Sequence, residues 1–187
     1  MIQIEKNKLY LVTGGGGFLG QPLVKHILNE GARVRIIGRD EATLVMMKQR
    51  HPSIEIHPGD ISDEFEVRQS MKDVDGVFHL AASKHVGLAE TFVRENLKSN
   101  VIGSFNIYEQ SLKQDLDFVL AISTDKAAQV VGVYGATKLM MERLSKQYQI
   151  KIIGLQPGEN FHEKVLDEGP FSNEVEQFTI EEIKELI

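Results

Sequence analysis

The sequence predicts an α/β fold in which a doubly wound parallel sheet carries helices on both faces. Short apolar runs alternate with longer segments of helical periodicity along most of the chain. The first apolar run stops at four consecutive glycines, residues 14–17, and a helical pattern starts directly after them. The hydrophobic content, 42% of 187 residues, suffices for the core of one domain. The alternation of the elements is what favours the doubly wound sheet.

The expected elements follow one another along the chain. Apolar and β-branched runs predict six strands, at residues 9–12, 32–37, 54–57, 74–80, 116–122 and 150–155. Helical periodicity between the strands predicts helices at residues 18–28, 41–50, 63–72, 91–113 and 134–148. Asp40 is the predicted N-cap of the second helix.

The glycine turn fits two known spacings. Residues 15, 17 and 20 match G-x-G-x-x-G, and residues 14, 17 and 20 match G-x-x-G-x-x-G. A strand, a glycine turn and a helix in this order form the phosphate-binding start of a Rossmann unit, because glycine lets the backbone approach a pyrophosphate and the helix N-terminus attracts anions. A flexible loop is the alternative interpretation, and the flanking strand and helix argue against it. The residues predicted to hold a dinucleotide here are Gly14, Gly17, Phe18, Leu19 and Gly20.

The end of the second strand bears on the choice of cofactor. An acid at this place holds the ribose 2′-hydroxyl of NAD, whereas an arginine accommodates the 2′-phosphate of NADP. Arg39 occupies the place, so the sequence favours NADP, with NAD as the alternative. A solvated surface arginine is the competing interpretation. Asp60 ends the third strand and is predicted either to meet the adenine, together with Ile61, or to cap a turn.

The segment after the fourth strand is predicted to contact both ligands. Two alanines leave room for a flat ring or a ribose against the backbone, although tight packing of strand on helix also explains them. The next side chains lie at the carboxyl edge of the sheet, where open α/β sheets bind ligands. A polar asparagine lies inside the long helix that follows, and a functional role and a solvent-facing position are equally compatible with the sequence. The predicted contacts are Ala81, Ala82 and Ser83 for the cofactor, and Lys84, His85 and Asn100 for the substrate.

A tyrosine and a lysine point to proton chemistry. Tyr134 and Lys138 lie four residues apart, so they share one face of the predicted helix. A nearby ammonium favours the phenolate form of a tyrosine, which brings this otherwise poor base into range. The lysine can also hold a ribose hydroxyl, so Tyr134 and Lys138 are predicted cofactor contacts as well. A hydroxyl, from Ser123 or Thr124, precedes them at a strand end. The alternative is a tyrosine and a lysine on a helix surface.

Asp125 and Lys126 place an acid and an amine side by side at the end of the fifth strand. Plain hydride transfer needs only the tyrosine, the lysine and a hydroxyl. An extra acid and base therefore imply a further proton step, such as an elimination beside a transient ketone. The alternative is a solvated turn with a local charge pair. The predicted catalytic residues are Thr124, Asp125, Lys126, Tyr134 and Lys138.

Six segments carry a resemblance to a known family: TGGGGFLG, GRDE, HLAASKHVGLAE, NLKSNVIGS, AISTDKAAQVVGVYGATKLMMERL and IIGLQPGENFHEKVLDEG. They resemble the UDP-N-acetylglucosamine 4,6-dehydratases, extended short-chain dehydrogenase/reductases of bacterial polysaccharide and pseudaminic acid pathways. The resemblance implies that Thr124 aligns a hydroxyl and that Tyr134 takes the proton of the sugar C4 hydroxyl. It implies that Lys126 removes the C5 proton and that Asp125 protonates the departing C6 hydroxyl, after which the hydride returns to C6.

The same resemblance implies the partners. The substrate would be a UDP-amino sugar, either UDP-N-acetylglucosamine or its 4-keto-6-deoxy derivative. The implied assembly is a homo-oligomer that pairs through the helices at 91–113 and 134–148.

The chain departs from this family in three places. The tyrosine helix runs almost directly into the next strand, without the family's substrate-binding segment. Gln156 and Asn160 stand where the family has an arginine and a lysine, which removes positive charge expected near a diphosphate. GRDE replaces SRDE, so Gly38 supplies no hydroxyl for a 2′-phosphate and weakens the case for NADP.

The net charge of −6 is unevenly distributed. Residues 159–187 contain nine acids and two lysines, so the rest of the chain is nearly neutral. We expect a dinucleotide-binding Rossmann domain at residues 1–155 and an acidic remnant of the substrate-binding lobe at residues 156–187. Under a second alignment, residues 151–161 are instead the sixth Rossmann strand and its loop.

Composition argues against several functional classes. The chain lacks a basic footprint for nucleic acid and contains no cysteine, which excludes disulfides and thiolate metal sites. The six histidines show no paired ligand spacing, so no metal site is predicted. The segment MIQIEKNK is too charged for a signal peptide and no apolar run reaches membrane-spanning length, so we expect a cytoplasmic protein without a membrane partner. Besides a nucleotide-sugar dehydratase or epimerase, the sequence allows a dinucleotide-binding regulator or pseudoenzyme, or a compact reductase of another small carbonyl compound.

Overall fold

The computed structural model describes residues 3–148 and 151–153, in which the chain forms a six-stranded sheet. The strand order is β3-β2-β1-β4-β5-β6, and each pairing is parallel. The predicted doubly wound sheet is confirmed. The order reverses between β1 and β4, which is where open α/β sheets bind their ligands. The strands are β1 Leu9–Thr13, β2 Arg33–Gly38, β3 Glu55–Pro58, β4 Gly76–His79, β5 Phe118–Ile122 and β6 Lys151–Ile153.

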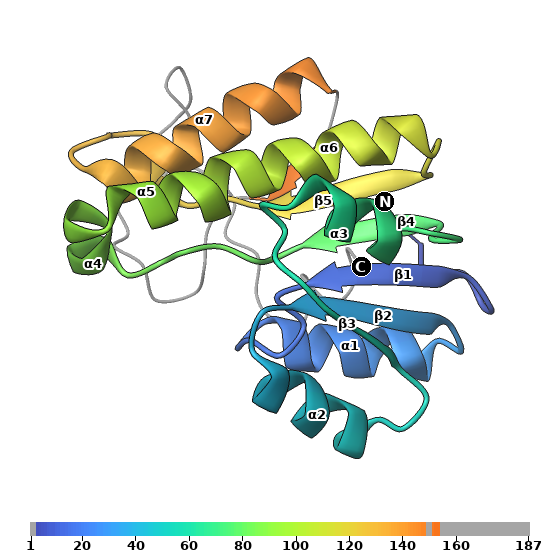
Figure 1. Ribbon diagram of the computed structural model, residues 1–187. Coiled ribbons are helices and arrows are strands. Elements are labelled where there is room, and N and C mark those ends of the chain that lie inside the picture. Colours follow the sequence, from blue (N-terminus) through green and yellow to red (C-terminus); the bar gives the residue numbers. More distant parts are fainter. Residues whose placement is uncertain (1–2, 149–150, 154–187) are drawn as a thin grey trace.

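Helices cover both faces of the sheet (Figure 1). α1 and α2 lie on one face, whereas α6 and α7 cross the other side by side. A π-helical stretch, η1 Leu97–Ile102, joins α5 to α6, and a short 3₁₀ turn, η2 Asp125–Ala127, precedes α7. The α-helices are α1 Gly20–Asn29, α2 Glu41–Arg50, α3 Glu64–Ser70, α4 Val86–Thr91, α5 Val93–Asn96, α6 Gly103–Lys113 and α7 Val133–Gln147.

Two hydrophobic cores hold the helices on the sheet, and β1 contributes to both. Leu9 and Leu11 belong to the core beneath α3, α6 and α7, while Tyr10 and Val12 belong to the core against α1 and α2. This alternation follows from the two-residue period of a strand. Burial on both faces explains why β1 is an uninterrupted apolar run. Burying one leucine in such a core contributes about 2 kcal/mol.

The long helix predicted at residues 91–113 is wrong as a single element. A separate helix, α4, already begins at Val86, and the backbone leaves helical geometry at Phe92 (φ −112°, ψ 55°) before α5 starts. From Val93 the helix continues to Lys113, with the π-helical segment η1 inside it. Over only six residues, the spacing of hydrophobic residues cannot distinguish a π-helical turn from an α-helical turn.

The other predicted elements agree with the structure apart from small shifts at their ends. The helix predicted at 41–50 is α2, and that at 134–148 is α7. The strand predicted at 150–155 corresponds to β6. Residues 154–187 lie outside the described part of the chain, and the expected acidic remnant at 156–187 falls there with Gln156 and Asn160.

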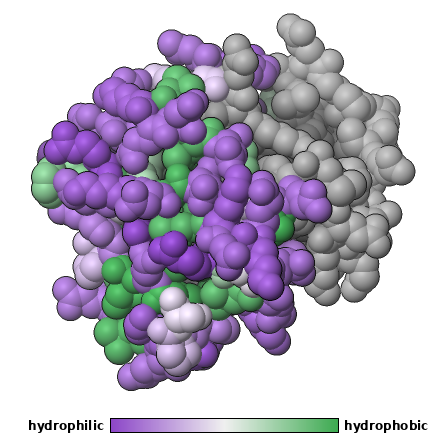
Figure 2. Space-filling model, turned by 90° about the vertical axis from the view of Figure 1, so that its right-hand side faces the viewer, coloured by the Kyte–Doolittle hydropathy of each residue, from purple (hydrophilic) through white to green (hydrophobic). Residues whose placement is uncertain are grey.

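The amino ends of the strands form a mainly hydrophilic surface, which faces the viewer in Figure 2. Lys8 and Asp117, which directly precede β1 and β5, form an ion pair of 2.5 Å at this edge. Exposed pairs of this kind contribute little to stability. The predicted site residues lie at the opposite edge.

Candidate functional site

The predicted site residues meet at the carboxyl edge of the sheet, around the switch between β1 and β4. A pocket of about 350 Å³ lies there. Its walls come from the glycine turn, the ends of β2, β3 and β4, and η1. A parallel sheet brings these segments together because all its strands end at one edge. The lining includes the predicted cofactor residues Gly14, Gly17, Arg39, Asp60, Ile61, Ala81 and Ala82.

The glycine turn is shaped by a close approach of two backbone segments. Gly14 has φ +69°, and a Cβ at this position would lie 2.9 Å from the backbone nitrogen of Ala81. The Gly14 carbonyl accepts a hydrogen bond of 2.9 Å from the Gly17 amide, and α1 begins at Gly20. Leu19, at the N-cap, supplies no capping side chain, and the first turn of α1 contains no acidic residue. The turn and the helix N-terminus therefore suit an anionic pyrophosphate.

Arg39 and Asp60 face each other across the ends of β2 and β3. The guanidinium lies 3.6 Å from the carboxylate, and the Arg39 side chain is 61% exposed. Asp60 also accepts a hydrogen bond of 2.9 Å from the Ser62 amide, so it caps a turn, one of its two predicted roles. Asp40 accepts a bond of 3.1 Å from the Ala42 amide, which confirms it as the N-cap of α2. The exposed arginine remains accessible to a phosphate.

Asn100 clamps the segment that follows β4. Its Oδ1 accepts a hydrogen bond of 2.7 Å from the Ser83 amide, and its Nδ2 donates to the Ser83 carbonyl and to the Thr137 hydroxyl, both at 3.0 Å. Asn100 is 1% exposed, so the solvent-facing alternative is wrong. These bonds use both amide hydrogens to hold the loop and α7. A direct contact of Asn100 with substrate stays a prediction.

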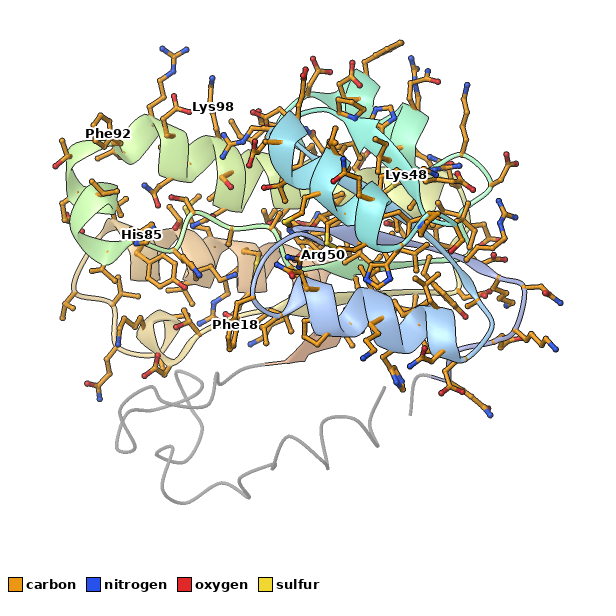
Figure 3. All side chains as sticks on the ribbon, turned by 90° about the horizontal axis from the view of Figure 1, so that it is seen from below. Phe18, Lys48, Arg50, His85, Phe92 and Lys98 are labelled. Atoms are coloured by element: carbon orange, nitrogen blue, oxygen red, sulfur yellow. The ribbon has the colours of Figure 1, made fainter. Side chains whose placement is uncertain are left out.

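Exposed side chains border the same edge. Phe18 projects from the glycine turn, and Lys84 and His85 follow the clamped loop at the start of α4. Figure 3 shows Phe18 and His85 toward the same end of the molecule. The predicted substrate contacts Lys84 and His85 are thus accessible to a ligand at the carboxyl edge.

The acid and amine after β5 lie on the short turn η2. Asp125 is 0% exposed, so the alternative of a solvated turn is wrong. Thr124 donates a hydrogen bond of 3.0 Å from its hydroxyl to Asp125 Oδ1. The other carboxylate oxygen lies 3.8 Å from Lys126 Nζ. A buried carboxylate with an ammonium and a hydroxyl beside it can exchange protons with a bound ligand.

Tyr134 and Lys138 are buried on α7, which packs against η2. They are 8% and 3% exposed, so the helix-surface alternative is wrong. Lys138 Nζ donates a hydrogen bond of 2.5 Å to the Ile122 carbonyl at the end of β5. Gly135 permits the approach of the two elements, because a Cβ there would lie 2.3 Å from the Lys126 carbonyl oxygen. The acid–amine pair and the tyrosine–lysine pair therefore belong to neighbouring, closely packed segments.

Two further carboxylates hold α7, and the sequence analysis missed both. Glu142 is buried and accepts a hydrogen bond from the Ser123 hydroxyl at the end of β5. Burial raises the pKa of the Glu142 carboxyl, while the Ser123 bond and the charge of Lys138 oppose that rise. Glu90 of α4 accepts a bond of 2.7 Å from the Val133 amide and so caps α7. The helical spacing could have identified Glu142, because it follows Lys138 by one turn. It could not have identified the Glu90 contact, because Glu90 and Val133 are 43 residues apart.

Residues 10–149 match a protein family described as polysaccharide biosynthesis protein. The chain belongs to this family. It is 39% identical over 143 residues to an uncharacterized membrane protein of Methanocaldococcus jannaschii, and 36% identical over 141 residues to the UDP-N-acetylglucosamine 4,6-dehydratase (inverting) of Campylobacter jejuni. It is 33% identical over 146 residues to a UDP-glucose 4-epimerase of Rickettsia canadensis. These alignments cover 73–75% of this chain and 42–43% of the relatives.

Solved structures agree with the fold over about four fifths of the chain. Pen from Bacillus thuringiensis superposes with a TM-score of 0.76 and 29% identity, covering 81% of this chain and 50% of that one. The UDP-glucose 4-epimerase of Thermotoga maritima with UDP-glucose gives a TM-score of 0.68 and 25% identity, covering 79% and 54%. The chain thus spans about half, or less, of the length of these proteins. In residues 3–148 and 151–153, no helix combines the length and apolarity that crossing a bilayer requires.

Proposed function

We propose that the pocket at the switch point binds a nicotinamide dinucleotide, with NADP preferred and NAD as the alternative. The glycine turn and the N-terminus of α1 would hold the pyrophosphate. Arg39 would meet the 2′-phosphate, Asp60 and Ile61 the adenine, and residues 81–83 the flat rings and a ribose. Lys138 would bind a ribose hydroxyl. The steric fit of the glycine turn, whose first residue has a positive φ, supports the proposal most directly.

The cofactor preference is tested by titrating the full chain with NADPH and with NADH and following nicotinamide fluorescence. We expect Arg39→Ala to weaken NADPH binding about tenfold, because a charge-assisted contact is lost, and to leave NADH within about twofold. Arg33→Ala is the matched control, since Arg33 is another exposed arginine associated with β2. Equal NADPH affinity in both variants contradicts the NADP preference.

We further propose that the chain acts on a UDP-amino sugar, by 4,6-dehydration or a closely related epimerisation. One observation carries this proposal: a buried acid and an amine lie on η2, packed against the helix with Tyr134 and Lys138. The identity to the Campylobacter jejuni dehydratase supports it. The names of the dehydratase and of the epimerase relatives both specify a UDP sugar as the substrate.

Each side chain has a role in the proposed reaction. The bound cofactor supplies reversible hydride acceptance. Thr124 orients the C4 hydroxyl, and Tyr134 takes its proton while Lys138 stabilises the phenolate. The reaction requires the shared proton of the Asp125–Lys126 pair to reside on the carboxyl group. Lys126, as the neutral amine, then removes the C5 proton, which a C4 ketone makes acidic. Asp125, as the neutral acid, donates its proton to the C6 hydroxyl, which leaves as water.

The activity is tested by incubating the full chain with UDP-N-acetylglucosamine and cofactor and following products by mass spectrometry and NMR. Loss of one water indicates dehydration, and an unchanged mass with an inverted C4 indicates epimerisation. We expect Asp125→Asn with Lys126→Ala to abolish dehydration and retain cofactor binding. Asp117→Asn with Lys8→Ala makes the same changes in an ion pair at the opposite edge and should leave turnover unchanged. Unimpaired dehydration by the first double variant contradicts the proposed roles.

A dinucleotide-binding protein without turnover is a second candidate. It is favoured by one observation, that the pocket at the switch point is lined by predicted cofactor residues and not by Asp125, Lys126 or Tyr134. Tight cofactor binding without conversion of UDP-N-acetylglucosamine or of its 4-keto-6-deoxy derivative supports this candidate over the enzyme.

A homo-oligomer that pairs through the α5–α6 run and α7 completes the proposal. Several large apolar side chains are exposed on these helices, and Figure 3 shows Phe92 at the bend that opens the run. Light scattering on the full chain tests the pairing, and a monomer at every concentration contradicts it. The exposed apolar residues are Phe92, Val93, Leu97, Ile102, Phe105, Leu112 and Met140.

A further inference from the structure

A buried chain of hydrogen bonds links the end of β1 to the helices that hold the candidate site. His79, the last residue of β4, lies at its centre. His79 Nδ1 is 2.8 Å from Thr13 Oγ1, and His79 Nε2 is 2.9 Å from Ser104 Oγ. Thr13, His79, Ser104 and Asn100 are each at most 2% exposed. The proposed reaction assigns no role to the first three of them.

The partners of each atom fix the positions of the protons. Thr13 Oγ1 accepts hydrogen bonds from the amides of residues 80–81, at 3.1 and 3.0 Å, which fills its two lone pairs. Its own hydrogen must then be donated to His79 Nδ1. His79 Nε2 therefore carries the ring hydrogen and donates it to Ser104. The Ser104 hydroxyl in turn donates to the Asn100 carbonyl at 2.7 Å.

This arrangement requires a neutral imidazole. A protonated ring has two donors and no acceptor, so it would confront the Thr13 hydroxyl with a second hydrogen. Burial lowers the pKa of His79 to about 3, and the positive charge of Lys138 is a second cause. The ring also meets Tyr108 edge-on, with 6.1 Å between centroids and 89° between planes, which restricts its orientation.

Asn100 extends the chain to both parts of the candidate site. Its side chain binds the amide and the carbonyl of Ser83, in the loop predicted to contact the cofactor. It also donates to Thr137, whose hydroxyl donates to the Tyr134 carbonyl at 2.8 Å. At the other end, Thr13 holds the backbone that leaves β4. A continuous set of bonds therefore joins the cofactor loop to the helix with the tyrosine.

We propose that His79 is a positioning residue for the cofactor loop and the catalytic helix. As a neutral ring donating from Nε2, it holds the end of β1 at a fixed distance from η1 and α6. It thereby sets the place of residues 81–83 and of α7. The proposal rests on the proposed function for the identity of the ligand, a nicotinamide dinucleotide, but its hydrogen-bond pattern is measurable without any ligand.

The first experiment reads the ring nitrogens of His79 directly. In the full chain labelled with ¹⁵N-histidine, long-range ¹H–¹⁵N spectra distinguish the two nitrogens. We expect an unprotonated Nδ1 and a protonated Nε2, unchanged from about pH 8 to about pH 5. The signals are assigned by their absence in His79→Gln, or through backbone couplings if that variant does not fold. A hydrogen on Nδ1, or titration of His79 in this range, overturns the proposal.

The second experiment tests the positioning role with two serines of α6. Ser104 and Ser111 are both buried, and each hydroxyl donates to the carbonyl four residues earlier. Of these two, Ser104 is the one for which the described residues show a bond to His79. We expect Ser104→Ala to weaken dinucleotide binding about five- to tenfold and to accelerate hydrogen exchange at the Ser83 amide. Ser111→Ala should leave both within about twofold of wild type.

The outcomes separate this proposal from the proposed function. Equal dinucleotide affinity and equal Ser83 exchange in the two serine variants overturn the positioning role. If the wild-type chain binds neither NADPH nor NADH, the proposed function fails. In that case the ring-nitrogen pattern and the exchange rate at Ser83 still decide whether His79 positions the loop.

Discussion

The glycine turn and the end of β5 lie on either side of the switch point, and they are held in different ways. Around the glycine turn the constraint is backbone against backbone, with Gly14 packed on the exit of β4. After β5 the backbone also approaches closely at one place, Gly135 against the Lys126 carbonyl, but side chains that are distant in the sequence add further constraints. Glu142 binds Ser123, and Thr137 binds Asn100.

This difference indicates what each region tolerates. A backbone segment cannot rotate away from an added methyl group as a side chain can. A Cβ on the glycine turn would therefore displace the whole turn. A lost side-chain hydrogen bond costs about 1 kcal/mol and leaves the surrounding packing in place. Substitution at Gly14 should therefore disrupt the glycine turn abruptly, whereas loss of a side-chain contact at the end of β5 should have a graded effect.

The largest effect is expected from Gly14→Ala. Alanine is disfavoured at φ +69°, and its Cβ would lie 2.9 Å from the Ala81 backbone nitrogen. We expect about 2–3 kcal/mol of destabilisation and at least about a 100-fold loss of dinucleotide affinity, measured by urea unfolding and fluorescence titration. Gly87→Ala is the control, because a Cβ at that position meets nothing within 4 Å. If both variants bind equally well, the backbone constraint does not shape the site.

The second prediction concerns the pH dependence of stability. It depends on His79, which is buried on β4 between the glycine turn and the end of β5. The folded pKa of His79, about 3, lies below the ordinary value of 6.5, so the unfolded chain binds a proton that the folded chain excludes. The contribution of the neutral His79 ring to the free energy of unfolding is then fully present above pH 6.5 and declines as the pH falls toward 3. The expected loss between about pH 6.5 and about pH 5 is about 2 kcal/mol. Urea unfolding across this range should give a shallower pH dependence for His79→Gln than for wild type or His85→Gln. Equal slopes in the three proteins contradict the neutral, buried ring.

The bond between Ser123 and Glu142 should show the graded response of the second region. In a double-mutant cycle of Ser123→Ala and Glu142→Ala, we expect a coupling free energy of about 1–2 kcal/mol in urea unfolding. Glu142→Gln retains an oxygen acceptor and should restore most of the coupling. Additive effects of the two alanine substitutions would show that the contact does not connect β5 to α7.

The smallest effect is expected at the start of α7. Glu90→Ala removes a side-chain cap from the Val133 amide, and the loss of such a cap typically costs about 1 kcal/mol. Hydrogen exchange at that amide should accelerate, with a small decrease in the unfolding midpoint. Glu95→Ala, an exposed glutamate on α5, is the control. Unchanged exchange at Val133 in Glu90→Ala would argue against the cap.

Local sequence patterns were sufficient for much of the fold. The glycine turn, the Asp40 cap of α2 and the helix with Tyr134 all depend on spacings within a few residues, and the structure contains each of them. The same kind of pattern failed at residues 91–113. There a bend at Phe92 and a π-helical segment interrupt a hydrophobic spacing that continues through both.

The order of strands and helices, the glycine turn and the residues of the tyrosine helix can be read from the sequence, because each is encoded in contiguous residues. The burial of Asp125, the partner of Glu142 and the neutral state of His79 cannot. These properties depend on which segments the parallel sheet brings to its carboxyl edge and on how much water they exclude there. Residues far apart in the chain supply that environment, so only the folded molecule specifies it.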